Sequence, residues 1–155
     1  MTKDKRQKDD IYFMRQALVE AEKAYKFGEI PVGTVIVLDE KIIARGHNQI
    51  VKLKDPTAHA EILAIKKAAV YLKNERLINT SMYVTIEPCA MCAGALILSR
   101  VKNLVYGADD LKTGACGSII NIAQHSSLNH QLNVKKGILE QECRELIQRF
   151  FKEKR

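Results

Sequence analysis

Apolar side chains recur every three or four positions in three long stretches of the chain. The first runs from Ile11 to Tyr25 and is followed by Gly28, a residue type that commonly ends a helix. The second runs from Ala58 to Lys73 and is preceded by Thr57, a candidate N-cap. The third runs from Leu139 to Lys152. This period is that of an α-helix with one buried face, so we expect helices over these three ranges.

Other stretches are rich in valine and isoleucine, which favour extended backbone. Two of them, Val32 to Leu38 and Ile42 to Gln49, are separated only by Asp39-Glu40-Lys41 and predict a β-hairpin. Three further predicted strands are shorter: Met82–Glu87, Val101–Tyr106 and Val134–Ile138.

A fourth helix is expected from Pro88 to Ser99, because proline is favoured in the first turn and the residues after it are almost all apolar. A helix without a polar face should be buried. We expect loops over 51–57 and 107–118, and a short helical turn over 119–123. The resulting order, α-β-β-α-β-α-β-β-α, predicts an α/β fold in which helices cover both faces of one sheet.

The length of 155 residues indicates one domain, 1–155, large enough to bury a core without disulfide bonds. Its C-terminal helix is expected within 139–155, and its charged first residues, 1–8, are expected to be frayed. Hydrophobic residues make up 46% and charged residues 28%, which excludes a disordered or collagen-like chain. The longest apolar run has ten residues, Cys89 to Leu98, and is too short to span a membrane. The N-terminus lacks the apolar segment of a signal peptide, so we expect a cytoplasmic protein.

Lysine and arginine total 25 against 18 aspartate and glutamate, a formal net charge of +7. This excess favours a polyanionic partner such as a nucleic acid, although many other proteins share it. Of the four cysteines, Cys89 and Cys92 form a close Cys-x-x-Cys pair. In the absence of a signal peptide, such a pair favours metal binding or redox chemistry over a structural disulfide.

Two short segments carry the candidate chemistry. The first contains His59 and Glu61 at the start of a predicted helix, and the second contains Cys89 and Cys92 at the start of another. The two cysteines are three positions apart, so a helix places them on one face, near an N-terminus that favours thiolate. Zinc binds imidazole nitrogen and thiolate sulfur, so His59 completes a set of three protein ligands. Three protein ligands leave one position for water, which is the pattern of a catalytic zinc site.

Glu61 lies two residues after His59, where it can reach a water in the open position without binding the metal. Zinc lowers the pKa of such a water from about 15.7 to about 7. A carboxylate beside it can carry a proton to a substrate nitrogen, which typically contributes about 10²–10⁴-fold in rate. The combination H-x-E followed by P-C-x-x-C is the known signature of the zinc nucleobase deaminases.

Other kinds of protein also contain a Cys-x-x-Cys pair. A redox pair does not require His-x-Glu at a helix start. A structural zinc site normally has four protein ligands, and Cys116 and Cys143 lie 27 positions apart and do not form a second close pair. A non-catalytic RNA-binding module stabilised by zinc has no use for Glu61. The residues therefore favour a catalytic zinc site.

Over nearly its whole length, the sequence resembles the bacterial tRNA-specific adenosine deaminases, members of the cytidine and deoxycytidylate deaminase superfamily. The zinc motif alone indicates only the superfamily. The narrower resemblance depends on Lys-Thr-Gly-Ala-Cys-Gly-Ser at 112–118 and on the final helix. Other matching segments are 30–33, 46–48, 55–62, 83–95 and 106–108.

The resemblance implies a three-layer α/β/α fold with a central mixed five-stranded sheet. It implies a homodimer that binds the anticodon stem-loop of a tRNA and hydrolytically deaminates the wobble adenosine to inosine, releasing ammonia. It implies one Zn²⁺ per subunit on His59, Cys89 and Cys92, with Glu61 as the catalytic proton shuttle. It also implies that four residues contact the substrate: Asn48, Ala60, Asp110 and Lys112.

The alternative is a zinc-dependent deaminase of a free base or nucleoside, of the guanine, cytosine or cytidine type. Zinc chemistry does not separate the two, because pocket shape and flanking contacts set the substrate. His59 in place of a cysteine argues mildly against the three-cysteine type that acts on free cytidine. The net charge of +7 favours a nucleic acid.

Overall fold

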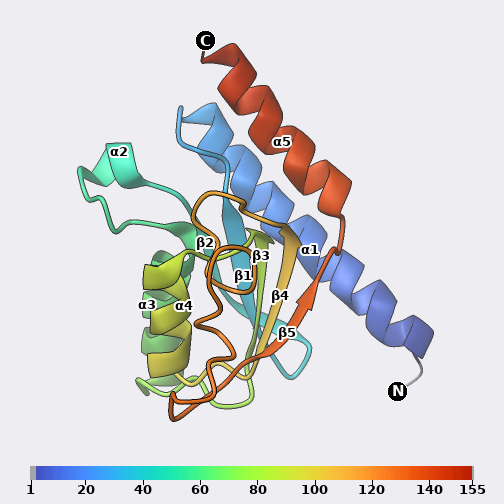
Figure 1. Ribbon diagram of the computed structural model, residues 1–155, viewed down its shortest axis with the longest axis vertical. Helices are drawn as coiled ribbons and strands as arrows, with labels where there is room; N and C mark the ends of the chain where they lie inside the picture. The colour runs from blue at the N-terminus through green and yellow to red at the C-terminus, as the bar shows by residue number, and fades with distance from the viewer. Residues whose placement is uncertain (1–2, 155) are drawn as a thin grey trace.

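A mixed sheet of five strands forms the middle layer of the structure, a computed structural model that describes residues 3–154 and the side chains of residues 9–154 (Figure 1). The strands lie in the order β2-β1-β3-β4-β5. β1 is antiparallel to both β2 and β3, whereas β4 is parallel to both β3 and β5. Their bounds are Gly33–Leu38 (β1), Lys41–His47 (β2), Ser81–Ile86 (β3), Asn103–Ala108 (β4) and Asn133–Lys136 (β5).

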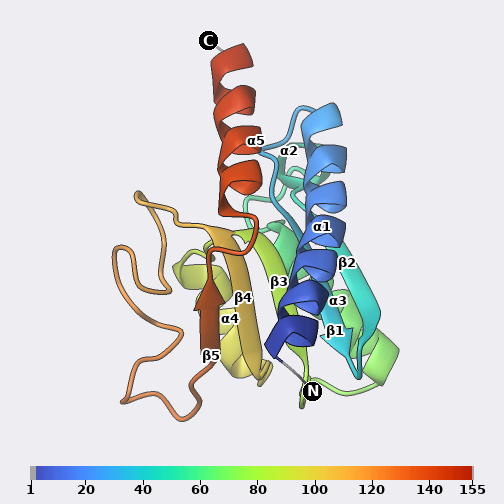
Figure 2. The same cartoon turned by 90° about the vertical axis from the view of Figure 1, so that its right-hand side faces the viewer.

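Helices cover both faces of this sheet (Figure 1, Figure 2). α1 and α5 lie on one face, α3 and α4 lie on the other, and the short α2 follows β2. This arrangement confirms the predicted three-layer α/β/α fold. Among the described residues, no helix combines the length and the apolar character needed to cross a membrane. The helices are Lys3–Lys26 (α1), Ile50–Leu53 (α2), Ala60–Leu72 (α3), Ala90–Leu98 (α4) and Glu140–Glu153 (α5).

Alternation of side chains along the strands divides the buried residues into two hydrophobic cores. In β1, Val35 belongs to the core that contains Met14 of α1, and the next residue, Ile36, belongs to the core that contains Ala64 of α3. All four of these side chains are fully buried. Burying a valine or isoleucine side chain contributes about 1.5–3 kcal/mol, so both faces of the central strand help to hold the layers together.

The two parallel strands β3 and β4 end at the same edge of the sheet, where α3 and α4 begin (Figure 1). β3 ends at Ile86 and is followed by Glu87, Pro88 and Cys89, the residue that precedes α4. Ligands of α/β proteins commonly bind at the carboxyl ends of parallel strands. The fold therefore brings both segments of candidate chemistry to the edge where a ligand is expected.

α1 begins earlier than the helical spacing of apolar residues predicts, whereas the fraying expected over 1–8 stays a prediction. The helix starts at Lys3, eight positions before the predicted start at Ile11. Residues 3–10 contain neither glycine nor proline, and lysine, arginine and glutamine have high helix propensity, so the helix extends backwards. Residues 1 and 2 lie outside the described part of the chain.

Two connecting segments also differ from the prediction. α2 forms within a segment that was expected to be a loop. No helical turn forms over 119–123, because the backbone there bonds to the preceding loop instead. Cys116 and Asn121 form an isolated antiparallel bridge, and the N–H of Ile122 donates to the carbonyl of Ala115.

Candidate active site

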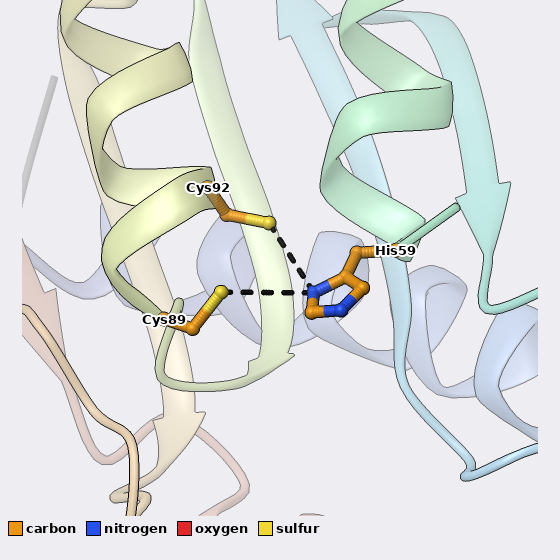
Figure 3. Close-up of side chains that lie close together, drawn as sticks. All are labelled: His59, Cys89 and Cys92. Carbon is orange, nitrogen blue, oxygen red and sulfur yellow. Dashed lines mark hydrogen bonds between the residues drawn. The ribbon is translucent and has the colours of Figure 1, made fainter. Parts of the chain in front are cut away.

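Three metal-binding side chains converge where α3 and α4 begin (Figure 3). The Nδ1 atom of His59 lies 3.7 Å from the Sγ atom of Cys89 and 3.6 Å from the Sγ atom of Cys92. The three ligand atoms all lie within 4.8 Å of one another. In a tetrahedral zinc centre with Zn–N of about 2.0–2.1 Å and Zn–S of about 2.3 Å, nitrogen and sulfur ligands are about 3.6 Å apart. The distances from His59 to both cysteines therefore fit a zinc centre.

The ends of two helices hold these ligands. His59 is the N-cap of α3 and Cys89 is the N-cap of α4, both with extended backbone, and Cys92 lies in the first turn of α4. Thr57, the predicted N-cap of α3, lies two residues before the true one. The N-terminal ends of both helices favour negative charge at this point. Segments thirty positions apart in the sequence thus meet at one metal-binding point.

The thiol group of Cys89 is arranged to ionise readily. Hydrogen bonding by Cys92 and His59 lowers the pKa of Cys89 to about 4. The interaction with Cys89 in turn raises the pKa of His59 above its ordinary value. Zinc binds thiolate rather than thiol, so these interactions prepare Cys89 for a metal ion.

Glu61, in the first turn of α3, is buried beside the ligands, with 4% of its surface exposed. Burial raises the pKa of its carboxyl group to about 7. A carboxyl group with a pKa near the working pH both accepts and donates protons efficiently. A pKa in this range is the one that the predicted role of Glu61 as a proton shuttle requires.

A cavity of about 170 Å³ opens onto His59, Cys89 and Glu61. A small cavity with mixed apolar and polar walls is typical of a site for a small molecule or a single base. Its walls come from four other parts of the chain, which supply both apolar and polar side chains. These residues are Ile30, Val32, Asn48, Ile50, Ile86, Glu87, Asp110 and Thr113.

Comparison with known proteins places this site in a family. The chain matches the model of the MafB19-like deaminases over residues 8–155. It is 48% identical over 147 residues to the tRNA-specific adenosine deaminase of Haemophilus influenzae, a match that covers 94% of this chain and 85% of the relative. The chain belongs to the tRNA-specific adenosine deaminase family. The cluster of His59, Cys89 and Cys92 is typical of the zinc site of this family.

Solved structures of deaminases share the fold. One, from a study of A-to-I editing by tRNA:A34 deaminases at the wobble position of transfer RNA, has a TM-score of 0.84 and 44% sequence identity. That match covers 87% of this chain and 98% of the other. A guanine deaminase from Nitrosomonas europaea has a TM-score of 0.79 at 24% identity, covering 90% of this chain and 83% of the other, and resembles this deaminase in fold alone.

Asn48 and Asp110, two of the four substrate-binding residues predicted for this deaminase, line the cavity. The side-chain carbonyl of Asn48 accepts a hydrogen bond from the N–H of Ala60 at 2.8 Å, and its amide donates to the carbonyl of Ile30 at 3.1 Å. Asn48 therefore joins the start of α3 to one wall of the cavity, in addition to any contact with substrate.

The other two predicted residues lie outside the cavity lining. Ala60 is fully buried, and its N–H is already bonded to Asn48. The side chain of Lys112 is exposed, and its backbone N–H donates to the Asp110 carboxylate at 3.0 Å. The structure thus brings Asn48 and Asp110 to the cavity of this deaminase but not Ala60 or Lys112.

Two buried carboxylates of the deaminase were not singled out from the sequence. Glu29 is 3% exposed and accepts hydrogen bonds from the N–H groups of Val51 and Lys52, at the start of α2. Glu87 is 2% exposed and accepts hydrogen bonds from the loop that contains Asp110. Glu29 belongs to no motif, and the signals available for Glu87 are its place within the matching segment 83–95 and directly before Pro88 and the metal ligand Cys89.

Proposed function

We propose that this chain deaminates the wobble adenosine of a tRNA anticodon, A34, to inosine with release of ammonia. The observation that carries the proposal is the zinc-type cluster of His59, Cys89 and Cys92, with Glu61 buried beside it, in a chain 48% identical to a tRNA-specific adenosine deaminase. The related structure from work on tRNA:A34 deaminases, with a TM-score of 0.84, supports the same substrate.

His59, Cys89 and Cys92 would hold one zinc ion per chain. A zinc ion with three protein ligands lowers the pKa of a bound water from about 15.7 to about 7 and so supplies a nucleophile at neutral pH. Glu61 takes the proton of the attacking water and delivers it to N1 of adenine as the oxygen bonds to C6. Glu61 then takes the proton of the new C6 hydroxyl group and gives it to the C6 amino group; the C6–N bond breaks, ammonia leaves, and the C6 carbonyl of inosine forms. One water and one adenosine thus give one inosine and one ammonia.

The cavity receives the base of a single nucleotide. A deaminase reaches its target atom only on a base that is out of the stack, and the bases of an anticodon loop are unpaired, which lowers the cost of extrusion. In our proposal, Asn48 contacts the purine from one wall, and Asp110 lies against the adjoining nucleotides from the other. Lys112 and Ala60 support these walls from outside the lining.

The substrate is tested by kinetics on a panel of compounds. The zinc-loaded protein is incubated with an anticodon stem-loop bearing a wobble adenosine, with free adenosine and with free guanine and cytosine, and ammonia release is measured. We expect the stem-loop to have the highest kcat/KM. Faster turnover of a free base or nucleoside would contradict the tRNA assignment and favour the alternative deaminase.

We also propose that the chain forms a homodimer, that the dimer binds tRNA, and that it acts in the cytoplasm. The net charge of +7 favours association with RNA phosphates. Large apolar side chains are exposed on α4 and on the loop over 111–120, and exposed apolar surface commonly marks protein interfaces. They are Met91, Leu98, Leu111, Ile119 and Ile120, with Leu98 83% exposed.

A further inference from the structure

Glu87 is a buried carboxylate that the proposed reaction does not use. Its Oε1 atom accepts hydrogen bonds from the N–H of Asp110, at 3.0 Å, and from the hydroxyl of Ser118. Its Oε2 atom accepts from the N–H of Cys116 at 3.0 Å and from the N–H of Ser118 at 3.1 Å. Four donors from one loop therefore converge on one carboxylate.

The loop that these donors belong to, 110–118, is also attached to the segment that carries a metal ligand. Gly114 forms an antiparallel bridge with Cys89, and the N–H of Ala115 donates to the carbonyl of Pro88 at 2.9 Å. A Cβ atom on Gly114 would overlap the Glu87 carboxylate and the carbonyl of Asp110. Glycine is therefore required where the loop and Glu87 approach each other.

The same loop forms one wall of the cavity. Asp110 and Thr113 both line it. The Asp110 carboxylate accepts hydrogen bonds from the N–H and hydroxyl of Thr113, at 3.0 and 2.7 Å, so these two side chains are fixed to each other. The N–H of Asp110, in turn, is held by Glu87. Glu87 is thus connected by hydrogen bonds through Asp110 to one wall of the cavity that opens onto Glu61 and two of the metal ligands.

We infer that Glu87 is a positioning residue for substrate recognition, which fixes the wall formed by Asp110 and Thr113 at the distance that the target base requires. This inference rests on the proposed function. Glu87 also lines the cavity, but both of its carboxylate oxygens accept hydrogen bonds from loop donors, so it acts through the loop. A displacement of about 1 Å in groups that position a substrate can lower kcat/KM by about 10²-fold.

Glu87→Gln is the most direct test, since glutamine has nearly the same size. In either orientation of the new amide, its NH₂ group faces a backbone N–H that has lost its acceptor. We expect kcat/KM for the anticodon stem-loop to fall by about 10²-fold, mainly through KM, while zinc content stays at one ion per chain. Glu75→Gln, the same change at an exposed residue, is the control and should match the wild type.

The kinetic pattern separates positioning from a purely structural role. A residue that only stabilises the fold would lower Tm and the fraction of active protein, leaving the KM of the active molecules unchanged. An unchanged KM in folded, zinc-loaded Glu87→Gln would overturn the inference. If that variant does not fold, Ser118→Ala serves instead, because it removes one of the four donors; we expect a smaller rise in KM, and no rise would contradict positioning.

Failure of the proposed function is distinguishable from failure of this inference. If the wild type does not deaminate the stem-loop, the proposed function is wrong. If the wild type is active and Glu87→Gln has the same KM for the stem-loop as the wild type, only the inference about Glu87 is wrong.

Discussion

The floor of the cavity and its walls are built in different ways. The floor consists of residues at the first turns of α3 and α4, which are two or three positions apart within each helix: His59, Glu61, Cys89 and Cys92. The walls are the segments 29–32 with 48–52 and the loop 110–118, and they are held by the buried carboxylates Glu29 and Glu87. These carboxylates bond to residues between 22 and 31 positions away in the sequence.

The floor of the cavity carries the groups that react, whereas the walls determine which substrate binds. Helix geometry fixes the reacting groups within each helix, so the spacing of His59 and Glu61, and that of Cys89 and Cys92, is already informative in the sequence. The shape around the substrate depends on contacts between distant segments. Variants of the floor should therefore lower the rate of the chemical step, whereas variants of the walls should change substrate affinity.

Removal of a metal ligand should have the largest effect on the floor. In Cys92→Ser, the zinc content measured by elemental analysis should fall far below one ion per chain. Deamination should be lost with it, because the metal supplies several kcal/mol of transition-state stabilisation. Cys143→Ala, a change of a buried cysteine in the core on the opposite face of the sheet, is the control and should keep its zinc. Full zinc occupancy in Cys92→Ser would show that the ligand set is different.

Glu61→Gln should separate proton transfer from metal binding within the floor. The variant keeps the size of the side chain but cannot shuttle a proton, so we expect kcat to fall by about 10²–10⁴-fold or more at full zinc occupancy. The readout is single-turnover inosine formation at matched zinc content. Near-normal turnover would assign the proton transfer to another group.

The outer face of the floor helix α4 is expected to lie against a second copy of the chain. Leu98→Glu should convert a dimer to a monomer, since an uncompensated charge buried in an interface costs about 3–5 kcal/mol. Light scattering across a range of concentrations measures this. Val70→Glu on α3, where the valine is 78% exposed, is the matched control. A wild type that is monomeric at high concentration, or a dimeric Leu98→Glu, would rule out this interface.

Glu29→Gln should produce a smaller effect, confined to a wall. Both oxygens of Glu29 accept backbone N–H groups, from Val51 at 3.1 Å and from Lys52 at 2.9 Å, so the glutamine amide leaves one of them without an acceptor. The start of α2, next to Ile50 and Asn48 in the cavity lining, should shift. We expect KM to rise about tenfold with little change in kcat. This is the pattern when a variant loses binding energy that the ground state and the transition state share equally. A fall in kcat with no change in KM would contradict the claim that the walls set substrate affinity and the floor sets the rate of the chemical step.

The sequence predicted the floor and the layered fold because both depend on short-range patterns. The run of valine and isoleucine in β1 corresponds to a strand buried on both faces, and the helical spacing of apolar residues in α3 and α5 corresponds to one buried face of each helix. His59, Cys89 and Cys92 could be interpreted as ligands because their side chains suit zinc and their spacing suits helix N-termini.

The walls could not be predicted in the same way. α2 follows Gln49, which forms no side-chain cap, and the acceptor for its first N–H groups is Glu29, more than twenty positions earlier. Glu87 was assigned as the last residue of a strand within the matching segment 83–95, but no short-range pattern links it to its four donors in the loop 110–118. Long-range hydrogen bonds of this kind become visible only in the folded chain.

The most direct test of the account is the nucleoside composition of an anticodon stem-loop after incubation with the zinc-loaded protein. The substrate carries its single loop adenosine at the wobble position, and a matched stem-loop carries it one position away. The account predicts one inosine and one ammonia per wobble adenosine, and little inosine in the displaced substrate. Equal conversion of both stem-loops, or no inosine in either with full zinc occupancy, would contradict it.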